Sequence, residues 1–412
     1  MKQTIFTIVS PIRSGWQGEV QAMLAALDYR GTLPAADVFG FGEAEMLHFA
    51  SLFLYDDPED GWFLVFENNI DGEIEAYLDR LLEIAQEKDG GRFLLRLFGH
   101  CQGFFGNDLK ELRGQWLAQV HRPAAGFVSA VGLTRQRIFQ DAAVYRVADA
   151  ALGSGAPKLS DEEAQAAVFN ALDADPETRD VWSSLPDRGE GPGLIERARA
   201  YLSIALNGLG FIFLALINLI PERIARQDNE RPDPSMVDWQ KQYEDHLPTN
   251  HMTSVVHLHW DAARHAAKLC AFGLLRGRVT LKHTDGKLGP IETIHFAHWS
   301  MLNQGRRLLF VSNYGGSWDS YLDDFTLKAS KGLTLAWAHG IGFPKSWFMV
   351  YGGAAKGPEF IDWARRSMVP SLVWYKAYPG LSAKNINRNR RLREALVDAK
   401  AGRGDTAWLG EV

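Results

Sequence analysis

Three histidines in the second half of the chain have residue types and spacing that could support chemistry. His257 and His259 lie two apart in the β-like run 253–259, and His295 lies at the start of a second such run, 294–301. Side chains alternate across a β-strand, so His257 and His259 share one face of theirs. If both strands belong to one sheet, the three imidazoles could point into the same space. They could then bind a metal ion, or one could be the axial ligand of a haem.

A structural role is the alternative for the same histidines. Histidines in strands also occur as hydrogen-bonded residues of a core or of its rim, and no carboxylate stands at a supporting position near these three. His48, in a similar stretch of the first half, corresponds to His295. A residue present in both halves more often supports the fold than the chemistry.

Asn313 and Asp319 are the other candidates for a catalytic role, together with His295. They flank a stretch typical of a strand exit, a Gly-Gly turn and a helix start. In a reactive site they would lie at the mouth of a cavity. The structural alternative is that Asn313 caps the helix that follows. Asp323 and Asp324 could bind a cation, but consecutive side chains on a helix point about 100° apart, which favours a solvated face.

The chain lacks the motifs of several large enzyme classes. It has no nucleophile elbow, Walker loop, dinucleotide fingerprint, zinc signature or kinase motif set. These absences weigh against hydrolases, NTPases and Rossmann-type dehydrogenases, but not against haem or oxygen chemistry, which needs few residues at fixed sequence spacing. A formal net charge of -6 argues against a nucleic-acid partner.

The cysteines and the N-terminal residues indicate a compartment. Cys101 and Cys270 lie in apolar surroundings without metal-binding spacing, which favours free thiols in a reducing compartment over a disulfide. Met1-Lys2-Gln3 is followed by a short β-like run in place of the long apolar core of a secretory signal. We therefore expect a cytoplasmic protein.

An internal repeat organises the chain. The His-Phe-Ala of 48–50 recurs at 295–297, which is 247 residues later, and thirteen further identities follow in the same order, sixteen in all. The offset between matching residues drifts by no more than four over about ninety residues. An ordered series of this kind indicates a duplication.

Each copy has the same predicted order of elements. A strand (4–9; 253–259) leads to a helix (16–27; 262–275), a hairpin (48–55 with 62–67; 293–302 with 307–312), a second helix (72–86; 317–328), a last strand (126–131; 371–377) and a closing helix (134–150; 382–399). This β-α-β-β-α-β order is that of a ferredoxin-like unit. We therefore predict an α+β fold with one unit over 1–150 and another over 252–412. Asn69, Asn313, Thr134 and Ser382 are the expected helix caps.

The region between the two units, 151–251, is predicted to be a helical linker. Ser160 and Glu163 are spaced as a capping box. Its segment 201–220 has 20 residues without a charge, enough to cover about 30 Å. Arginines flank the segment: Arg197, Arg199, Arg223 and Arg226.

A single membrane crossing by 201–220 would put the two units on opposite sides of the membrane, which conflicts with units that pack together. Besides such a crossing, two other placements of the segment are possible. The segment lies on or dips into one leaflet as a monotopic anchor, or it is buried in the protein or in the interface of a homo-oligomer.

Two tandem ferredoxin-like units resemble the dimeric α+β barrel superfamily, whose single-chain duplicated members include dye-decolorising peroxidases and chlorite-dismutase-like haem proteins. The resemblance covers 1–150 and 252–400 and rests on element order and duplication. It implies a pseudo-dimeric α+β barrel around a cavity, with an inserted helical region. The peroxidase motif Gly-x-x-Asp-Gly has its nearest counterpart in the Asn-Asn-Ile-Asp-Gly of 68–72, and Gly315 takes the aspartate position in the second copy. The second copy also resembles a group of uncharacterised bacterial proteins. This second resemblance implies no particular activity.

Together these features lead to two expectations for function. The first is an oxidoreductase, peroxidase- or oxygenase-like, with haem held by His257, His259 or His295. It would act on an apolar or lipid-derived substrate at a membrane surface that residues 201–220 contact. The alternative is a non-catalytic protein that binds a hydrophobic ligand or partner on the membrane, and either could form a homo-oligomer. An absorption band near 400 nm would distinguish the haem protein.

Overall fold

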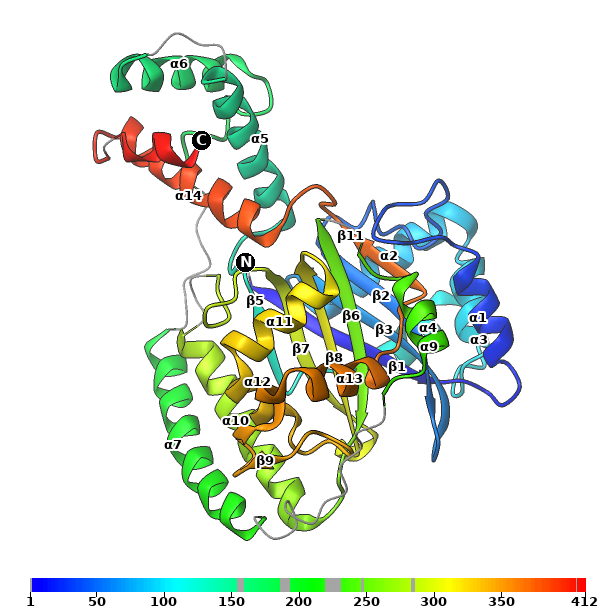
Figure 1. The fold of residues 1–412 in the computed structure, drawn as a ribbon. Coiled ribbons are helices and arrows are strands. Elements are labelled where there is room, and N and C mark those ends of the chain that lie inside the picture. The colour runs from blue at the N-terminus through cyan, green and yellow to red at the C-terminus, as the bar shows by residue number, and fades with distance from the viewer. Residues whose placement is uncertain are drawn as a thin grey trace.

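The computed structural model describes residues 2–153, 159–185, 193–218, 231–245, 248–282, 286–404 and 406–412. Within these residues the fold is α+β, as the sequence predicts. Two antiparallel sheets lie against each other, and helices cover their outer faces (Figure 1).

The first sheet has five strands in the order β11-β2-β3-β1-β4, and the second has four in the order β5-β7-β8-β6. The strands of the first are β1 (Gln3–Pro11), β2 (Leu47–Asp57), β3 (Gly61–Asp71), β4 (Val120–His121) and β11 (Val373–Lys376). Those of the second are β5 (Ala125–Val128), β6 (Thr249–His257), β7 (Ile294–Leu302) and β8 (Arg307–Gly315). Alternation along each strand sends one set of side chains inward between the sheets and the other outward to the helices.

The two copies exchange their last strands. β5 belongs to the first copy but pairs with β7 of the second, with Gly126 opposite His298. β11 belongs to the second copy but pairs with β2 of the first, with Trp374 opposite Ser51. Each sheet therefore contains strands from both copies, and the two copies cannot separate without breaking β-ladders.

The sheets do not close into a barrel, so the predicted pseudo-dimeric barrel is wrong in this respect. In the part of the chain that the structure describes, both sheets stay open, and no ladder joins one to the other. Apolar side chains from both inner faces fill the space that a barrel cavity would occupy, among them Phe53, Val65, Leu309 and Val311. The inner layer is thus a packed core.

Helices cover the outer faces. The first sheet packs against α1 (Gln17–Ala25), α2 (Ile74–Asp89), α3 (Arg92–Gly99) and α4 (Leu109–Ala118). The second packs against α10 (Ala262–Lys282), α11 (Trp318–Lys328), α12 (Ser330–Trp337) and α13 (Pro358–Ser367). Short segments complete this side: η1 (Asn303–Gly305), β9 (Ser346–Trp347), β10 (Tyr351–Gly352) and η2 (Gly353–Lys356).

A helical lobe stands apart from the sheets at the top of Figure 1. It consists of α5 (Arg135–Ala151), α6 (Asp161–Ala174), α14 (Ala383–Lys400) and η3 (Ala407–Glu411), which pack around Trp182 and Trp408. The closing helices of both copies, α5 and α14, meet here through a buried ion pair between Asp141 and Arg393. The inserted region adds α7 (Leu194–Ile217), which lies beside α10, and α9 (Pro234–Lys241).

The local predictions have mixed outcomes. Thr134 and Ser382 cap α5 and α14, and Ser160 and Glu163 form the expected capping box, so these are confirmed. Both cysteines are free thiols, as expected. Residues 219 and 220 of the apolar segment, and Arg223 and Arg226 beyond it, lie outside the described residues.

The prediction that Asn69 and Asn313 cap helices is wrong. Both lie within strands, β3 and β8, which run further than the apolar alternation suggests. The N-cap positions of the helices that follow are Glu73 and Ser317. The strands extend because the inner layer accepts polar side chains at these positions.

Candidate functional site

Buried polar side chains form a group within the layer between the sheets. Glu67 and Asn69 come from the first sheet, and His251, His298 and Asn313 come from the second; all five are buried. A buried polar group costs free energy unless it finds a partner, so this group is the first place to look for function.

Glu67 and His298 are two titratable residues of this group that lie close to each other. The Glu67 carboxyl accepts hydrogen bonds from Ser51 and Asn69, and its Oε1 lies 3.9 Å from His298 Nδ1. Burial raises the pKa of Glu67 to about 8 and lowers that of His298 to about 3. Both groups are therefore uncharged at neutral pH, which is how two titratable residues can stay in a closed apolar layer.

His251 connects hydroxyl groups to an amide. Its Nδ1 lies 3.0 Å from Asn313 Oδ1, and its Nε2 lies 3.0 Å from both Ser371 Oγ and Thr253 Oγ1. Trp374 Nε1 also donates to Asn313 Oδ1 at 3.0 Å, and because an indole can only donate, this bond fixes which amide atom is the oxygen. The Nδ1 of His251 must then carry the proton, and Nε2 accepts from the hydroxyls.

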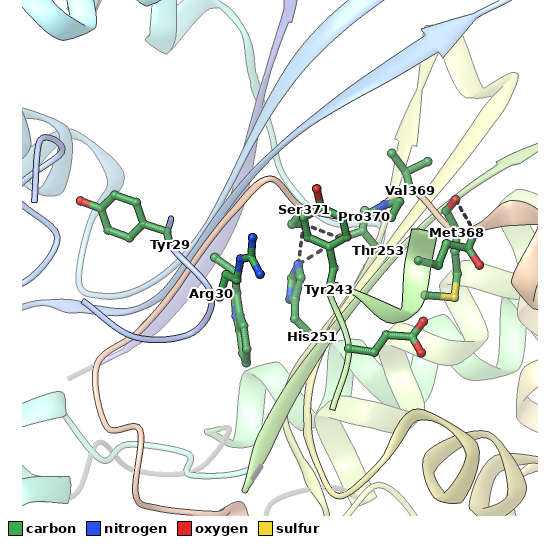
Figure 2. Close-up of a pocket in the computed structure, with 12 residues that line it drawn as sticks. Tyr29, Arg30, Tyr243, His251, Thr253, Met368, Val369, Pro370 and Ser371 are labelled. Carbon is green, nitrogen blue, oxygen red and sulfur yellow. Dashed lines mark hydrogen bonds between the residues drawn. The ribbon is translucent and has the colours of Figure 1, made fainter. Parts of the chain in front are cut away.

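His251, Thr253, Ser371 and Trp374 of this cluster line a small pocket, and Figure 2 shows the bonds from His251 to Ser371 and Thr253. Tyr29, Arg30, Tyr243, Glu244 and Met368 are among the residues around it. The space between them is about 20 Å³, which is room for one or two water molecules.

The connectivity of Ser371, His251 and Asn313 is that of a nucleophile, a base and an orienting group. Two properties oppose such a role. Burial lowers the pKa of His251 to about 4, which makes it a weak base at neutral pH. The pocket also accommodates water but no substrate. The cluster can therefore order water between buried polar groups, and it holds β6, β8 and the start of β11 together.

His295 lies at the far end of β7 from the other predicted ligands. Its Nε2 is 3.3 Å from Thr249 Oγ1, and its ring packs against Phe49 and Tyr378. Burial, with the nearby Lys376 cation, lowers its pKa to about 3. The imidazole is thus neutral and enclosed in the core.

His257 and His259 lie at the opposite end of the second sheet. His257 pairs with Arg307 in β8, whereas His295 lies beside Tyr314, seven residues along that strand. At about 3.3 Å per residue this is roughly 23 Å. His257 Nε2 bonds to the Tyr55 hydroxyl at 3.0 Å, and the backbone of His259 bonds to His339. The structure does not bring His295 to the other two.

Asn313 and Asp319, the other predicted catalytic residues, lie on different sides of the second sheet. Asn313 is on the inner face with His251, whereas Asp319 is an exposed residue in the first turn of α11, 3.8 Å from Arg365. Asp324 forms an ion pair with Lys328. No group of three or more His, Cys, Asp or Glu residues that could hold a metal ion occurs in the described part of the chain.

The sequence prediction missed His251 because it began the strand at residue 253. β6 begins at Thr249, so His251, Thr253, Val255 and His257 share the inner face. Extending the alternation of Thr253 and Val255 by two residues toward the N-terminus would have found His251.

No family model, curated protein or solved structure matches this chain. What can be inferred about function therefore depends on the surfaces and cavities of the molecule itself.

Proposed function

We propose that this protein attaches to a membrane surface through one face of α7 and binds a hydrophobic ligand there, without a catalytic role. The observation that supports the proposal is the exposure of apolar side chains along this helix. Ten are exposed: Leu194, Ile195, Tyr201, Leu202, Leu206, Leu209, Ile212, Phe213, Leu216 and Ile217. Continuous apolar surface on this scale is typical of a membrane or protein interface.

The length and composition of α7 suit contact with lipid. It has 24 residues, about 36 Å of helix, and a mean hydropathy of 2.1 over its most apolar window, of which 17% is buried. Length and composition alone would also permit a crossing. Arg197 and Arg199 are exposed in its first turns, where their guanidinium groups could reach lipid phosphates.

Its packing favours a position in the plane of the membrane over a crossing. Gly273 and Gly277 of α10 let α7 approach closely, since a Cβ on Gly273 would lie 2.4 Å from Asn207 and one on Gly277 would lie 2.7 Å from Ile204. A crossing helix would have to take α10, with its Arg276 and Arg278, into the bilayer. The strand exchange also keeps both copies on one side of any membrane.

A second apolar feature lies beside the C-terminal half of α7. The β9–β10 hairpin exposes Trp347, Phe348 and Tyr351, and Met349 at its tip packs with Phe211 against α10. Aromatic residues of this kind are enriched where proteins meet the membrane interface.

The backbone of the hairpin tip also bears on this proposal. Phe348 and Met349 have φ of 54° and 53°, a left-handed conformation that costs bulky residues about 1–2 kcal/mol each. In this turn Met349 is buried and Phe348 is exposed beside the apolar face of α7.

The oxidoreductase function, its haem and membership of the dimeric α+β barrel superfamily stay predictions. The two duplicated sheets with exchanged strands are compatible with that superfamily. The packed inner layer and the separation of His295 from His257 and His259 favour the binding protein over the haem enzyme.

Flotation with phosphatidylcholine–phosphatidylglycerol vesicles tests the membrane contact. Leu206→Glu combined with Phe213→Glu changes two side chains that are 62% and 64% exposed, so the fold should persist. Losing two inserted apolar groups should reduce the free energy of vesicle binding by about 3 kcal/mol or more. This lowers the partition coefficient at least about 100-fold.

The control is Phe105→Glu, a side chain that is 86% exposed in the first half and that should leave flotation unchanged. Equal flotation of the wild type and the α7 variant would refute the proposal. If the variant instead converts a dimer to a monomer in light scattering without lipid, the exposed face is an interface between copies.

A further inference from the structure

A cavity of about 510 Å³ lies on the outer side of the second sheet, between α10, α11 and α12. This volume is within the range of small-molecule sites, and it is far larger than the space beside His251. Its walls are mostly apolar: Leu275, Val279, Leu288, Pro290, Trp299, Phe325, Leu327 and Leu333. Such walls favour a hydrocarbon chain.

The charged residues in the described lining of the cavity all have the same sign. Arg278, Lys328 and Lys331 are the only charged residues among its described lining, and each is exposed toward solvent. Lys328 pairs with Asp324, while the Lys331 ammonium lies 5.3 Å from the Tyr351 ring. The lining therefore offers positive charge that an anionic head group would complement.

The start of α12 lies beside one of these cations, Lys331. Ser330, Lys331 and Gly332 form its first turn and also line the cavity. The N-cap position is Ala329, which has no side chain that can accept a hydrogen bond from the first turn. The amide groups of this turn favour an anion close to Lys331, which lies in the same turn.

The cavity and α7 use different faces of α10. Cys270, Gly273 and Gly277 contact α7, whereas Leu275 and Val279 line the cavity, and these two sets lie roughly 170° apart around the helix. α10 thus stands between the exposed apolar helix and the cavity.

We propose that this cavity binds a single-chain anionic lipid, with the hydrocarbon chain among the apolar walls and the head group at Arg278, Lys331 and the start of α12. The inference rests on the proposed function, since it names the ligand and the place where that ligand binds. Charge complementarity selects the anion over a neutral amphiphile of the same length.

Calorimetric titration of the full chain with dodecanoate, without any membrane, tests the site. Arg278→Glu combined with Lys331→Glu should weaken dodecanoate binding by more than tenfold, because both charges reverse at exposed positions. Val279→Trp should narrow the cavity and weaken binding. Lys110→Glu, an exposed cation on α4, should bind as the wild type does, and dodecanol should bind more weakly than dodecanoate.

Failure of the wild type to bind dodecanoate would overturn the proposal, as would unchanged binding by the charge-reversal variant or equal binding of dodecanol. The two proposals can fail separately. The Leu206→Glu, Phe213→Glu protein should still bind dodecanoate. If this variant binds dodecanoate normally and also floats with vesicles as the wild type does, only the membrane contact is rejected. Loss of dodecanoate binding by the charge-reversal protein with normal flotation is the result expected if both are correct.

Discussion

The two copies share a framework but bury different polar groups in it. Each has a strand irregularity at the same place, next to His48 in β2 and next to His295 in β7. Each also sends a tyrosine from the following helix to the strand: Tyr77 donates to Asn68 at 2.8 Å, and Tyr321 donates to Ser312 at 2.6 Å. These matching bonds belong to the fold.

The difference lies in the hydrogen-bond partners of His48 and His295, the two histidines at these strand irregularities. His48 Nε2 is 3.0 Å from Asp71, and its Nδ1 is 3.1 Å from the Tyr378 hydroxyl. His295 has Thr249 at 3.3 Å, because Gly315 stands where the first copy has Asp71. A histidine that looked reactive in the second copy is therefore a framework residue whose acidic partner is absent from that copy.

The largest effect should come from removing that acidic partner in the first copy. Asp71→Ala leaves His48 without its carboxylate and deprives the Arg135 amide, 2.7 Å away, of its acceptor. Leaving a buried hydrogen-bonding group without its partner costs about 1–3 kcal/mol, and this substitution affects two such groups. Urea unfolding should show this loss, whereas Thr249→Ala, which removes the partner of His295, should cost about 1 kcal/mol. Similar losses for both variants would show that the two sites do not differ as described.

The second effect concerns Glu67, whose counterpart in the second copy is Val311. The folded-state pKa of Glu67, about 8, is above its ordinary 4.5, so the folded protein holds a proton that the unfolded chain releases. Stability is then fully present below pH 4.5 and is lost as the pH rises toward 8. Glu67→Gln removes this loss and should stabilise the protein at pH 7 by on the order of 3 kcal/mol.

Urea midpoints at pH 5 and pH 8 measure this prediction. The difference between Glu67→Gln and the wild type should be several times larger at pH 8 than at pH 5. Glu59→Gln, at an exposed position two residues before β3, serves as the control and should follow the wild type. A constant difference between Glu67→Gln and the wild type at both pH values would contradict the raised pKa.

Sequence patterns predicted the parts of this fold that depend on local order. The hairpins, most helices and three caps follow from alternation, helical periodicity and the residues at helix starts, all of which are properties of neighbouring residues. The exchange of β5 and β11 could not be predicted in this way. Each is four residues long, and its choice between two similar sheets depends on packing across the whole molecule.

The candidate site was less predictable for a related reason. His257, His259 and His295 share a residue type, but the sequence does not record that β6 and β7 put them at opposite ends of one sheet. The lipid cavity has no motif at all, because its walls come from α10, α11, α12, β7 and the segment Leu288–Pro290. The exposed face of α7 was partly predictable, since an uncharged run is visible in sequence, but its exposure is a tertiary property.

The smallest effect should come from giving the second copy the acidic residue of the first. Gly315→Asp is sterically feasible, since a Cβ there would lie 3.4 Å from the nearest atom, the Pro248 carbonyl oxygen, and the backbone is not left-handed. A carboxylate near His295 should raise its pKa from about 3 by about 1 unit or more.

An NMR titration of the His295 ring protons measures this change. The folded-state pKa of His295 is below the ordinary 6.5, so the wild type loses stability as the pH falls from 6.5 toward 3. In the Gly315→Asp protein this loss should shrink by about 1.4 kcal/mol per unit of pKa regained. His298, whose pKa is lowered by burial in the same layer, is the internal control and should titrate unchanged. An unaltered His295 pKa would mean that the aspartate at this position faces away from the imidazole, and that the two copies differ in backbone as well as in side chains.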